Sequence, residues 1–294
     1  GFSKHQFFFD WSLDSLGLLP GETVEYYFET WDNDGVNGTK SVKSDLKKYK
    51  SPSIGEISKI GDKNNNKLEK NMKEALELAK RLKKELSDAQ KKAIDKKMIS
   101  WEDKQNMRQM LENQRNLQKE VEKIKSQTTE NFKQQTQFKE IDQRLKEKQK
   151  ALEELIDKIM TDEMKEFYSE MDDLMEKMDK KKLQELMEQM GMDAEDIEKE
   201  LDRSLEIFKQ LALEQKLQHV IDQLDQLKEK QQKLSEKTDK KDSKSNDNKQ
   251  KQDQLNNEFD KVQENLEGLR EMNSDLESPN DLPDTKQKEN EIDT

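Results

Sequence analysis

Hydrophobic residues after residue 52 recur at intervals of three and four, although 41% of the chain is charged and only 30% is hydrophobic. This spacing places the apolar side chains on one face of an α-helix. With so little apolar surface, the chain has no means to build a large single core that offsets the entropy lost on folding. We therefore predict long, solvent-exposed helices that pack through narrow apolar stripes, as helical hairpins and coiled coils do.

Composition argues against several classes of site. The chain has no cysteine, which excludes disulfides, thiolate metal sites and cysteine nucleophiles. His5 and His219 are far apart in sequence and have no partners at zinc-ligand spacing. The formal net charge of −12 disfavours a nucleic-acid-binding surface. Acidic pairs such as Asp172 and Asp173 are expected on solvated faces, so we predict no catalytic site and no cofactor.

Most of the aromatic residues lie in residues 1–51, whose pattern is that of β-strands. Residues 22–31 are rich in Thr, Val and aromatic side chains and follow a turn signal at Pro20 and Gly21. Another turn signal at residues 32–35 precedes a second strand-like run at 40–49. So few strands are unstable alone. We predict that residues 1–51 are the C-terminal strands of a truncated, Ig-like β-sandwich.

Residues 52–160 are predicted to form a long antiparallel helical hairpin. Ser100 and Asp103 are typical of the start of a helix, and Trp101 beside them is expected to pack over the hairpin turn. The second helix is predicted to run on to about residue 159, with a strained or loosely packed middle. That middle places polar residues on the apolar stripe, namely Thr128, Gln135 and Gln149. The predicted stripe of the first helix consists of Leu68, Met72, Ala75, Ala79, Leu82, Leu86, Ala89 and Ala93, and that of the second includes Leu117, Val121 and Ile124.

The rest of the chain divides by composition into four further segments. Residues 161–235 are predicted to be methionine-rich helices, with Gly191 as a C-cap and a new helix beginning near Asp193. The remaining predicted segments are a low-complexity linker at 236–257, a short helix at 258–273 and a disordered acidic tail at 274–294. The fold class is therefore mainly α.

Two motifs invite a binding interpretation. Asp32 and Asp34 followed by Gly35 resemble part of a calcium loop, but a hairpin turn of the same composition is the more typical structure. The six methionines Met164, Met171, Met175, Met178, Met187 and Met190 recur at helical spacing. Methionine stripes fill helical cores in most proteins, and in some they form a groove for partner helices. We keep both interpretations and name these six as candidate interaction residues.

Residues 26–41, with the sequence YYFETWDNDGVNGTKS, resemble the end of the β-domain of domain of unknown function 4175, a family of large proteins of Bacteroidota. Residues 100–104 (SWEDK) and 198–211 (EKELDRSLEIFKQL) are also similar to that family. The resemblance implies a parent protein with membrane helices near its N-terminus, followed by β-sandwich material and then long helices. It also implies that the helical region lies on the periplasmic side of the inner membrane. The family has no known catalytic residues.

These observations favour a non-enzymatic, extracytoplasmic coiled-coil scaffold of a membrane-anchored protein of unknown function. Its partners would be proteins, including copies of itself through coiled coils, and not nucleic acid. Membrane attachment would come only from missing N-terminal segments. Two alternatives remain open: a regulatory or structural subunit of an ATP-driven envelope machine, and a cytoplasmic coiled-coil adaptor.

Overall fold

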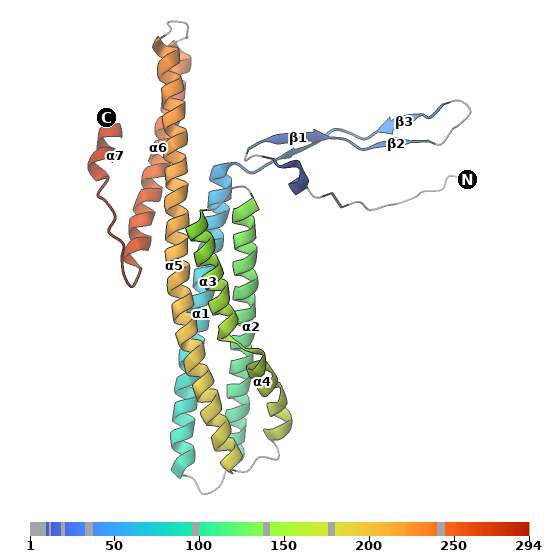
Figure 1. The fold of residues 1–294 in the computed structure, drawn as a ribbon, viewed down its shortest axis with the longest axis vertical. Helices are drawn as coiled ribbons and strands as arrows, with labels where there is room; N and C mark the ends of the chain where they lie inside the picture. The colour runs from blue at the N-terminus through green and yellow to red at the C-terminus, as the bar shows by residue number, and fades with distance from the viewer. Residues whose placement is uncertain are drawn as a thin grey trace. The chain divides into compact units, whose positions relative to one another are not determined.

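The computed structural model describes residues 10–11, 13–18, 21–32, 38–95, 100–137, 142–175, 180–239 and 245–293. Most of these residues are helical, and the described strands form two small antiparallel sheets of two strands each (Figure 1). Contacts divide the chain into two compact units. One contains Gly1–Gly61 and Lys133–Glu140, and the other contains Asp62–Phe132 and Ile141–Thr294. The predicted mainly α fold is confirmed.

In the first unit, the strands form one bulged hairpin, which we call the β-ribbon. Strand β1 (Thr23–Tyr26) pairs with β4 (Lys47–Lys50), and β2 (Glu29–Trp31) pairs with β3 (Ser41–Lys43). Between the two sheets, residues 27–28 lie opposite residues 44–46, so one strand carries an extra residue. Ser44 bridges this bulge, because its backbone N–H donates to the Phe28 carbonyl at 2.8 Å and its hydroxyl accepts from the Phe28 N–H at 2.9 Å. The described strands therefore form a hairpin, and they do not show the β-sandwich that we predicted.

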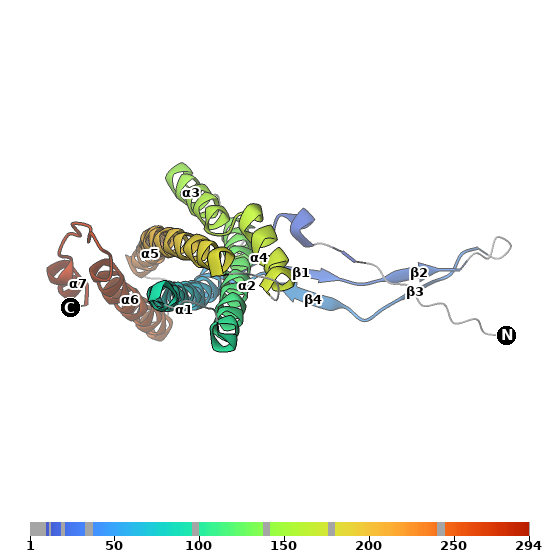
Figure 2. The ribbon, with the colours of Figure 1, turned by 90° about the horizontal axis from the view of Figure 1, so that it is seen from below.

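The core of the second unit is an antiparallel four-helix bundle. Its four members are α1 (Ile54–Asp95), α2 (Trp101–Gln137), the consecutive pair α3 (Gln143–Ile159) and α4 (Asp162–Met175), and α5 (Lys180–Asp239). Figure 2 shows α1, α2, α3 and α5 nearly end-on. Neighbouring members run in opposite directions, because residue numbers rise along one helix while those of its contact partners fall along the other. The contacts are Asn71–Gln127 and Glu85–Asn113 between α1 and α2, Lys125–Asp157 and Arg115–Tyr168 between α2 and the α3–α4 pair, Lys148–Glu214 and Tyr168–Asp193 between that pair and α5, and Asn65–Gln215 and Lys83–Glu198 between α1 and α5.

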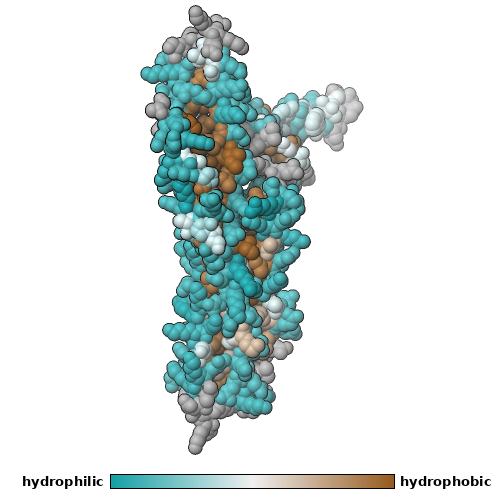
Figure 3. Space-filling view, turned by 60° about the vertical axis from the view of Figure 1, so that its left-hand side comes forward, coloured by the Kyte–Doolittle hydropathy of each residue, from teal (hydrophilic) through white to brown (hydrophobic). Residues whose placement is uncertain are grey.

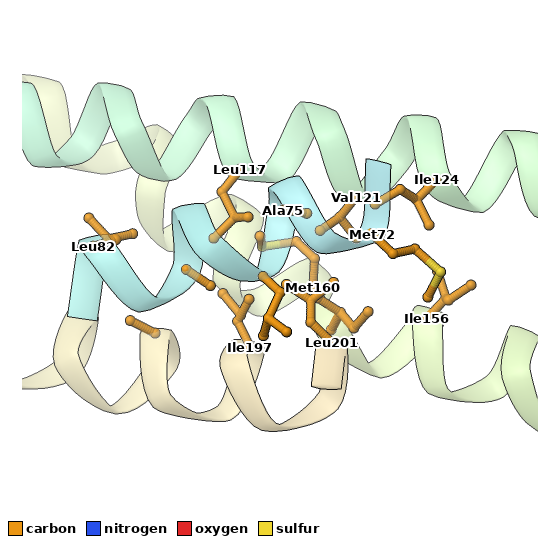
Figure 4. Packing of buried hydrophobic residues seen from close by; sticks show 14 of the residues in the cluster. Met72, Ala75, Leu82, Leu117, Val121, Ile124, Ile156, Met160, Ile197 and Leu201 are labelled. Atoms are coloured by element: carbon orange, nitrogen blue, oxygen red, sulfur yellow. The ribbon is translucent and has the colours of Figure 1, made fainter. Parts of the chain in front are cut away.

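The bundle interior is lined by the apolar stripes that the spacing predicted. Side chains from α1, α2, α3 and α5 point toward a shared interior in Figure 4. Leu82, Ile124 and Leu201, from three different helices, are each at most 1% exposed. Truncating such a buried leucine costs about 2–5 kcal/mol, because a cavity adds to the lost burial. Nine of the predicted positions are buried, namely Leu68, Met72, Ala75, Ala79, Leu82, Leu86, Leu117, Val121 and Ile124. Ala89 is half-buried against the same cluster, and the side chain of Ala93 lies outside the described residues.

Two helices of the bundle begin with the same capping motif. At the start of α2, the Ser100 N–H and hydroxyl donate to the Asp103 carboxylate, and the Ser100 hydroxyl accepts from the Asp103 N–H. This confirms the predicted helix start. Ser53 and Glu56 make the same reciprocal bonds at the start of α1. The hydrogen bond from the Ser53 backbone lowers the pKa of Glu56 below its ordinary value.

The prediction of one helix from residue 101 to 159 is wrong. Helix α2 ends at Gln137, and α3 begins at Gln143 with Asp142 as its N-cap. The Asp142 carboxylate accepts the Arg144 N–H at 2.7 Å, so the side chain replaces a backbone acceptor that a continuous helix would have supplied. The break lets α3 run back along α2. Helix α3 ends before Met160, close to the predicted boundary between residues 160 and 161, and the Thr161 hydroxyl accepts the Met164 N–H.

Gly191 does not end a helix, contrary to our prediction. It lies inside α5, which continues for 60 residues. The Gln90 side chain from α1 reaches the α5 backbone here and donates to the Met187 carbonyl at 2.7 Å. A Cβ at position 191 would lie 3.1 Å from Gln90 Nε2. The lack of a side chain at Gly191 therefore lets α1 and α5 approach closely. Asp193 does not begin a new helix, and its carboxylate bonds to neighbouring side chains.

The C-terminal region is more helical than the composition suggested. Residues predicted as linker lie in α5 up to Asp239 and in α6 (Ser245–Ser274) from residue 245. Helix α6 packs antiparallel on the end of α5, with polar contacts such as Lys230–Glu258 beside a small apolar seam. A chain this polar still forms a helical hairpin when apolar residues recur at heptad spacing on the facing sides of its helices. That seam consists of Leu213, Val220, Phe259, Val262, Leu269 and Leu276.

The tail predicted to be disordered is also ordered in its described residues, which end at 293. The Asn273 side chain donates to the Asn280 carbonyl and accepts the Asn280 N–H, which reverses the chain after α6. Helix α7 (Lys286–Asp293) then joins α6 through the ion pair between Arg270 and Glu289 at 2.6 Å.

Candidate interaction surfaces

The β-ribbon exposes an unusual number of large apolar side chains. Five of them, Tyr27, Phe28, Trp31, Val42 and Leu46, are between 46% and 73% exposed. In the described residues no further strand pairs with the outer edges of the ribbon. Unpaired strand edges beside exposed aromatic residues are typical of surfaces that another strand covers.

Charge on the β-ribbon is divided between its two arms. Glu25 and Glu29 lie on β1 and β2, and they form ion pairs with Lys48 and Lys43 on the opposite arm. Lys43 also donates a hydrogen bond to the Tyr27 hydroxyl at 3.1 Å and lies 4.4 Å from the centre of that ring. The Tyr27 hydroxyl, followed by the Glu29 carboxylate, raises the pKa of Lys43 above its ordinary value. These exposed pairs hold the two arms in register and add little stability.

Of the proposed calcium ligands, Asp32 has a structural role and Asp34 lies outside the described residues. Asp32 Oδ1 accepts the Lys40 N–H at 2.8 Å, and the Asp32 N–H donates to the Lys40 carbonyl at 2.9 Å. Asp32 thus closes the described end of the β-ribbon. Within the described parts of the chain, no three Asp, Glu or His side chains come together as a metal ion would require.

The candidate interaction methionines that the structure describes belong to the bundle core. Met187 and Met190 are 4% and 0% exposed, and Met164 packs against the same apolar cluster. The side chains of Met187 and Met190 therefore fill the interior of this chain, and Met164 is half-buried beside them. Met178 lies outside the described residues, as do the side chains of Met171 and Met175 on α4.

Helix α5 carries an exposed apolar stripe where it leaves the bundle. Leu217, Ile221 and Leu224 are 38%, 43% and 36% exposed, and we call these three residues the α5 stripe. Val220 and Leu227 lie on a neighbouring face of the same helix and pack against α6. Apolar side chains gather in the part of the molecule that contains the α5–α6 pair (Figure 3). The sequence placed Leu217, Ile221 and Leu224 on one helix face, but it gave no sign that this face is exposed.

A buried polar contact joins α4 to α5. The Tyr168 hydroxyl donates to Asp193 Oδ2 at 2.7 Å, and Gln189 Nε2 donates to Asp193 Oδ1 at 2.8 Å. Tyr168 is 1% exposed and Asp193 is 5% exposed. Burial, and next the negative charge of Asp193, raise the pKa of Tyr168. Sequence reasoning missed this contact, because the two residues are 25 positions apart and lie on different helices.

Amide side chains replace apolar ones in one layer of the bundle. Asn131 donates to Asn65 at 2.6 Å, and Asn65 donates to Gln215 at 3.2 Å, so one row links α2, α1 and α5. Gln149 of α3 is 7% exposed, and its Nε2 has no hydrogen-bond partner among the residues that the structure describes. The polar positions Thr128 and Gln149 indicate an irregular section of the core from sequence, but the amide row of Asn65 and Asn131 is not apparent from sequence.

The exposure of Trp101 differs from the expectation. Trp101 is 76% exposed, so the prediction that it packs over the hairpin turn is wrong. Its position at the first turn of α2 directs the side chain away from the apolar stripe. None of the described helices combines the length and the apolar character that crossing a membrane requires.

Comparison with known proteins found no matching family model, no matching curated protein and no matching solved structure. The resemblance to domain of unknown function 4175 therefore stays a prediction.

Proposed function

We propose that this chain is a non-enzymatic coiled-coil scaffold, part of a membrane-anchored protein, that holds protein partners on the periplasmic side of the inner membrane. The observation that carries the proposal is the length and continuity of α5. Its 60 residues correspond to about 90 Å at 1.5 Å per residue. One half of α5 belongs to the four-helix bundle and the other half to the α5–α6 hairpin, so a single rigid element connects two packed regions.

The β-ribbon supports the same proposal. A two-stranded hairpin is marginally stable alone, and this one exposes Trp31, Phe28 and Val42. We propose that further strands of the parent protein cover these side chains in an Ig-like β-sandwich. The ribbon leads directly into α1, because the Gly21 N–H donates to the Pro52 carbonyl and Ser53 caps the helix. A covered ribbon would thus fix the start of α1 to the rest of the parent protein.

The location rests on the sequence resemblance and not on the structure. The resemblance implies membrane helices in another part of the parent protein, and it implies that this region lies outside the cytoplasm. The same helices in the cytoplasm would make the chain a cytoplasmic adaptor. An experiment that reports location and partner contact together therefore tests the whole proposal.

Cysteine labelling provides that experiment, because the chain has no cysteine of its own. Gln226→Cys on exposed α5 and Trp101→Cys at the start of α2 are introduced separately into the parent protein. A membrane-impermeant maleimide with a photoreactive group is added to intact spheroplasts, followed by light. We expect labelling before lysis at both positions and discrete adducts with another protein from at least one of them.

The unsubstituted chain is the control and should show no labelling in this region. Labelling only after lysis would contradict the periplasmic location. Efficient labelling without any adduct at either position would contradict the scaffold role, whatever the location.

A further inference from the structure

The α5 stripe has no covering element within its own unit among the described residues. The contact between Lys148 and Glu214 sets the register of α3 on α5, and α3 begins five residues earlier, at Gln143. Given equal rise in both helices, Ile221 and Leu224 therefore have no α3 residue opposite them, and Leu217 lies level with the first turn of α3 but is still 38% exposed. Helix α6 covers a different face, through Val220 and Leu227. The stripe lies between these two contact faces.

We propose that a second copy of this chain covers the α5 stripe, with the two α5 helices antiparallel and related by a two-fold axis at Ile221. Leu217 lies four residues before Ile221, and Leu224 lies three residues after it. An antiparallel pair therefore places Leu217 of each copy beside Leu224 of the other. This self-complementary arrangement is what a two-fold symmetric interface requires.

Charge complementarity favours the antiparallel direction. Glu214 lies seven residues before Ile221 and Lys228 lies seven after it, so both share its face of the helix. The two-fold axis brings Glu214 of one copy opposite Lys228 of the other, twice in the dimer. A parallel pair would instead place lysine against lysine and glutamate against glutamate.

Both charged groups are available for this contact. The Glu214 side chain is 25% exposed while it binds Lys148 at 2.6 Å and Arg144 at 3.2 Å. A carboxylate has about four acceptor positions, so a further ammonium group is accommodated. Lys228 is exposed. The contact area is small beside the roughly 1,200 Å² of stable complexes, so we expect a weak, reversible dimer.

The inference goes beyond the proposed function. A scaffold can act as a monomer, and a weak dimer can form in either compartment. A failure of the dimer test therefore leaves the location and partner experiment intact, and the reverse also holds.

Disulfide cross-linking of single-cysteine variants tests the geometry in the purified chain. A cysteine at the two-fold axis meets its own copy, so Ile221→Cys should form a disulfide-linked dimer under mild oxidation. Leu217→Cys or Leu224→Cys alone should cross-link poorly, but a mixture of the two should give the mixed dimer. Gln226→Cys, on another face of α5, is the matched control. We expect Ile221→Cys to react at least about tenfold faster than the control, because a disulfide needs Cβ atoms about 4 Å apart.

Sedimentation velocity without oxidant measures the same dimer. Lys228→Glu should weaken association about two- to tenfold, since it replaces two exposed ion pairs with two repulsions. Ile221→Asp should abolish association with an unchanged helical circular dichroism spectrum.

Three results would overturn the proposal. The first is equal cross-linking at 221 and 226, and the second is faster cross-linking of Leu217→Cys alone, which indicates a parallel pair. The third is a monomer whose Ile221→Cys thiol is shielded from maleimide, which means that another part of the same chain covers the stripe.

Discussion

One buried hydroxyl, that of Tyr168, ties α4 to α5. It donates to Asp193 at 2.7 Å, and in Tyr168→Phe the carboxylate keeps only Gln189 as a side-chain donor among the bonds described. We expect the free energy of unfolding to fall by about 1–3 kcal/mol, because a buried acceptor loses its partner. Denaturant titration measures this loss. Tyr27→Phe, at an exposed side chain, is the control and should stay within about 0.5 kcal/mol of the unsubstituted chain.

Tyr168 should also make the free energy of unfolding depend on pH. Burial, then the charge of Asp193, raise the pKa of Tyr168 above its ordinary value near 10. The unfolded chain therefore releases the phenol proton at a lower pH than the folded chain does. The stability contributed by Tyr168 is complete below about pH 10 and is lost as pH rises above that value. Stability should fall less steeply above pH 10 in Tyr168→Phe, and identical slopes would contradict this assignment.

At the scale of helices, the amide row of Asn131, Asn65 and Gln215 connects three members of the bundle. Asn65→Leu removes the acceptor of the buried Asn131 amide group and the donor to the half-buried Gln215 side chain, so we expect a loss of about 1–3 kcal/mol in unfolding free energy. In Asn65→Leu with Asn131→Leu, the contact between Asn65 and Asn131 is lost only once, and the double loss should be smaller than the sum by about 0.5–3 kcal/mol. Asn65→Leu combined with Tyr168→Phe, at a distant level of the bundle, should be additive. Additivity in both pairs would show that the amide row is not coupled.

The helices could be predicted where a local signal exists, and not where the signal comes from another helix. Ser100 and Asp103 lie three residues apart, so their capping bonds are readable from sequence. The buried stripe of α1 follows from spacing alone. Gly191 looks like a helix end until Gln90 of α1 is seen to reach the α5 backbone beside it. The row of Asn65 and Asn131 was missed for the same reason, since those residues are 66 positions apart.

For the second unit as a whole, α5 belongs to two apolar clusters of unequal size. The bundle cluster draws residues from all four of its helical members, whereas the α5–α6 cluster is a single seam between two helices. The free energy of local unfolding increases with the number of buried apolar contacts that must be broken. The bundle and the α5–α6 hairpin should therefore unfold locally as separate regions. We expect hydrogen exchange to show well-protected amides in α1 and in α5 near Leu201, and faster exchange in α6 and in α5 beyond about residue 220.

The prediction is most specific for α5, because the amides of one continuous helix would show two levels of protection from hydrogen exchange. Leu201→Ala, in the bundle cluster, should increase exchange in α1 and in the first half of α5. Val262→Ala, in the α5–α6 cluster, should increase exchange in α6 and in the second half of α5 only. If both variants change exchange along all of α5 alike, the two clusters open as one cooperative unit. In that case α5 would transmit a change at either end to the other, and would not serve only as a rigid connection between them.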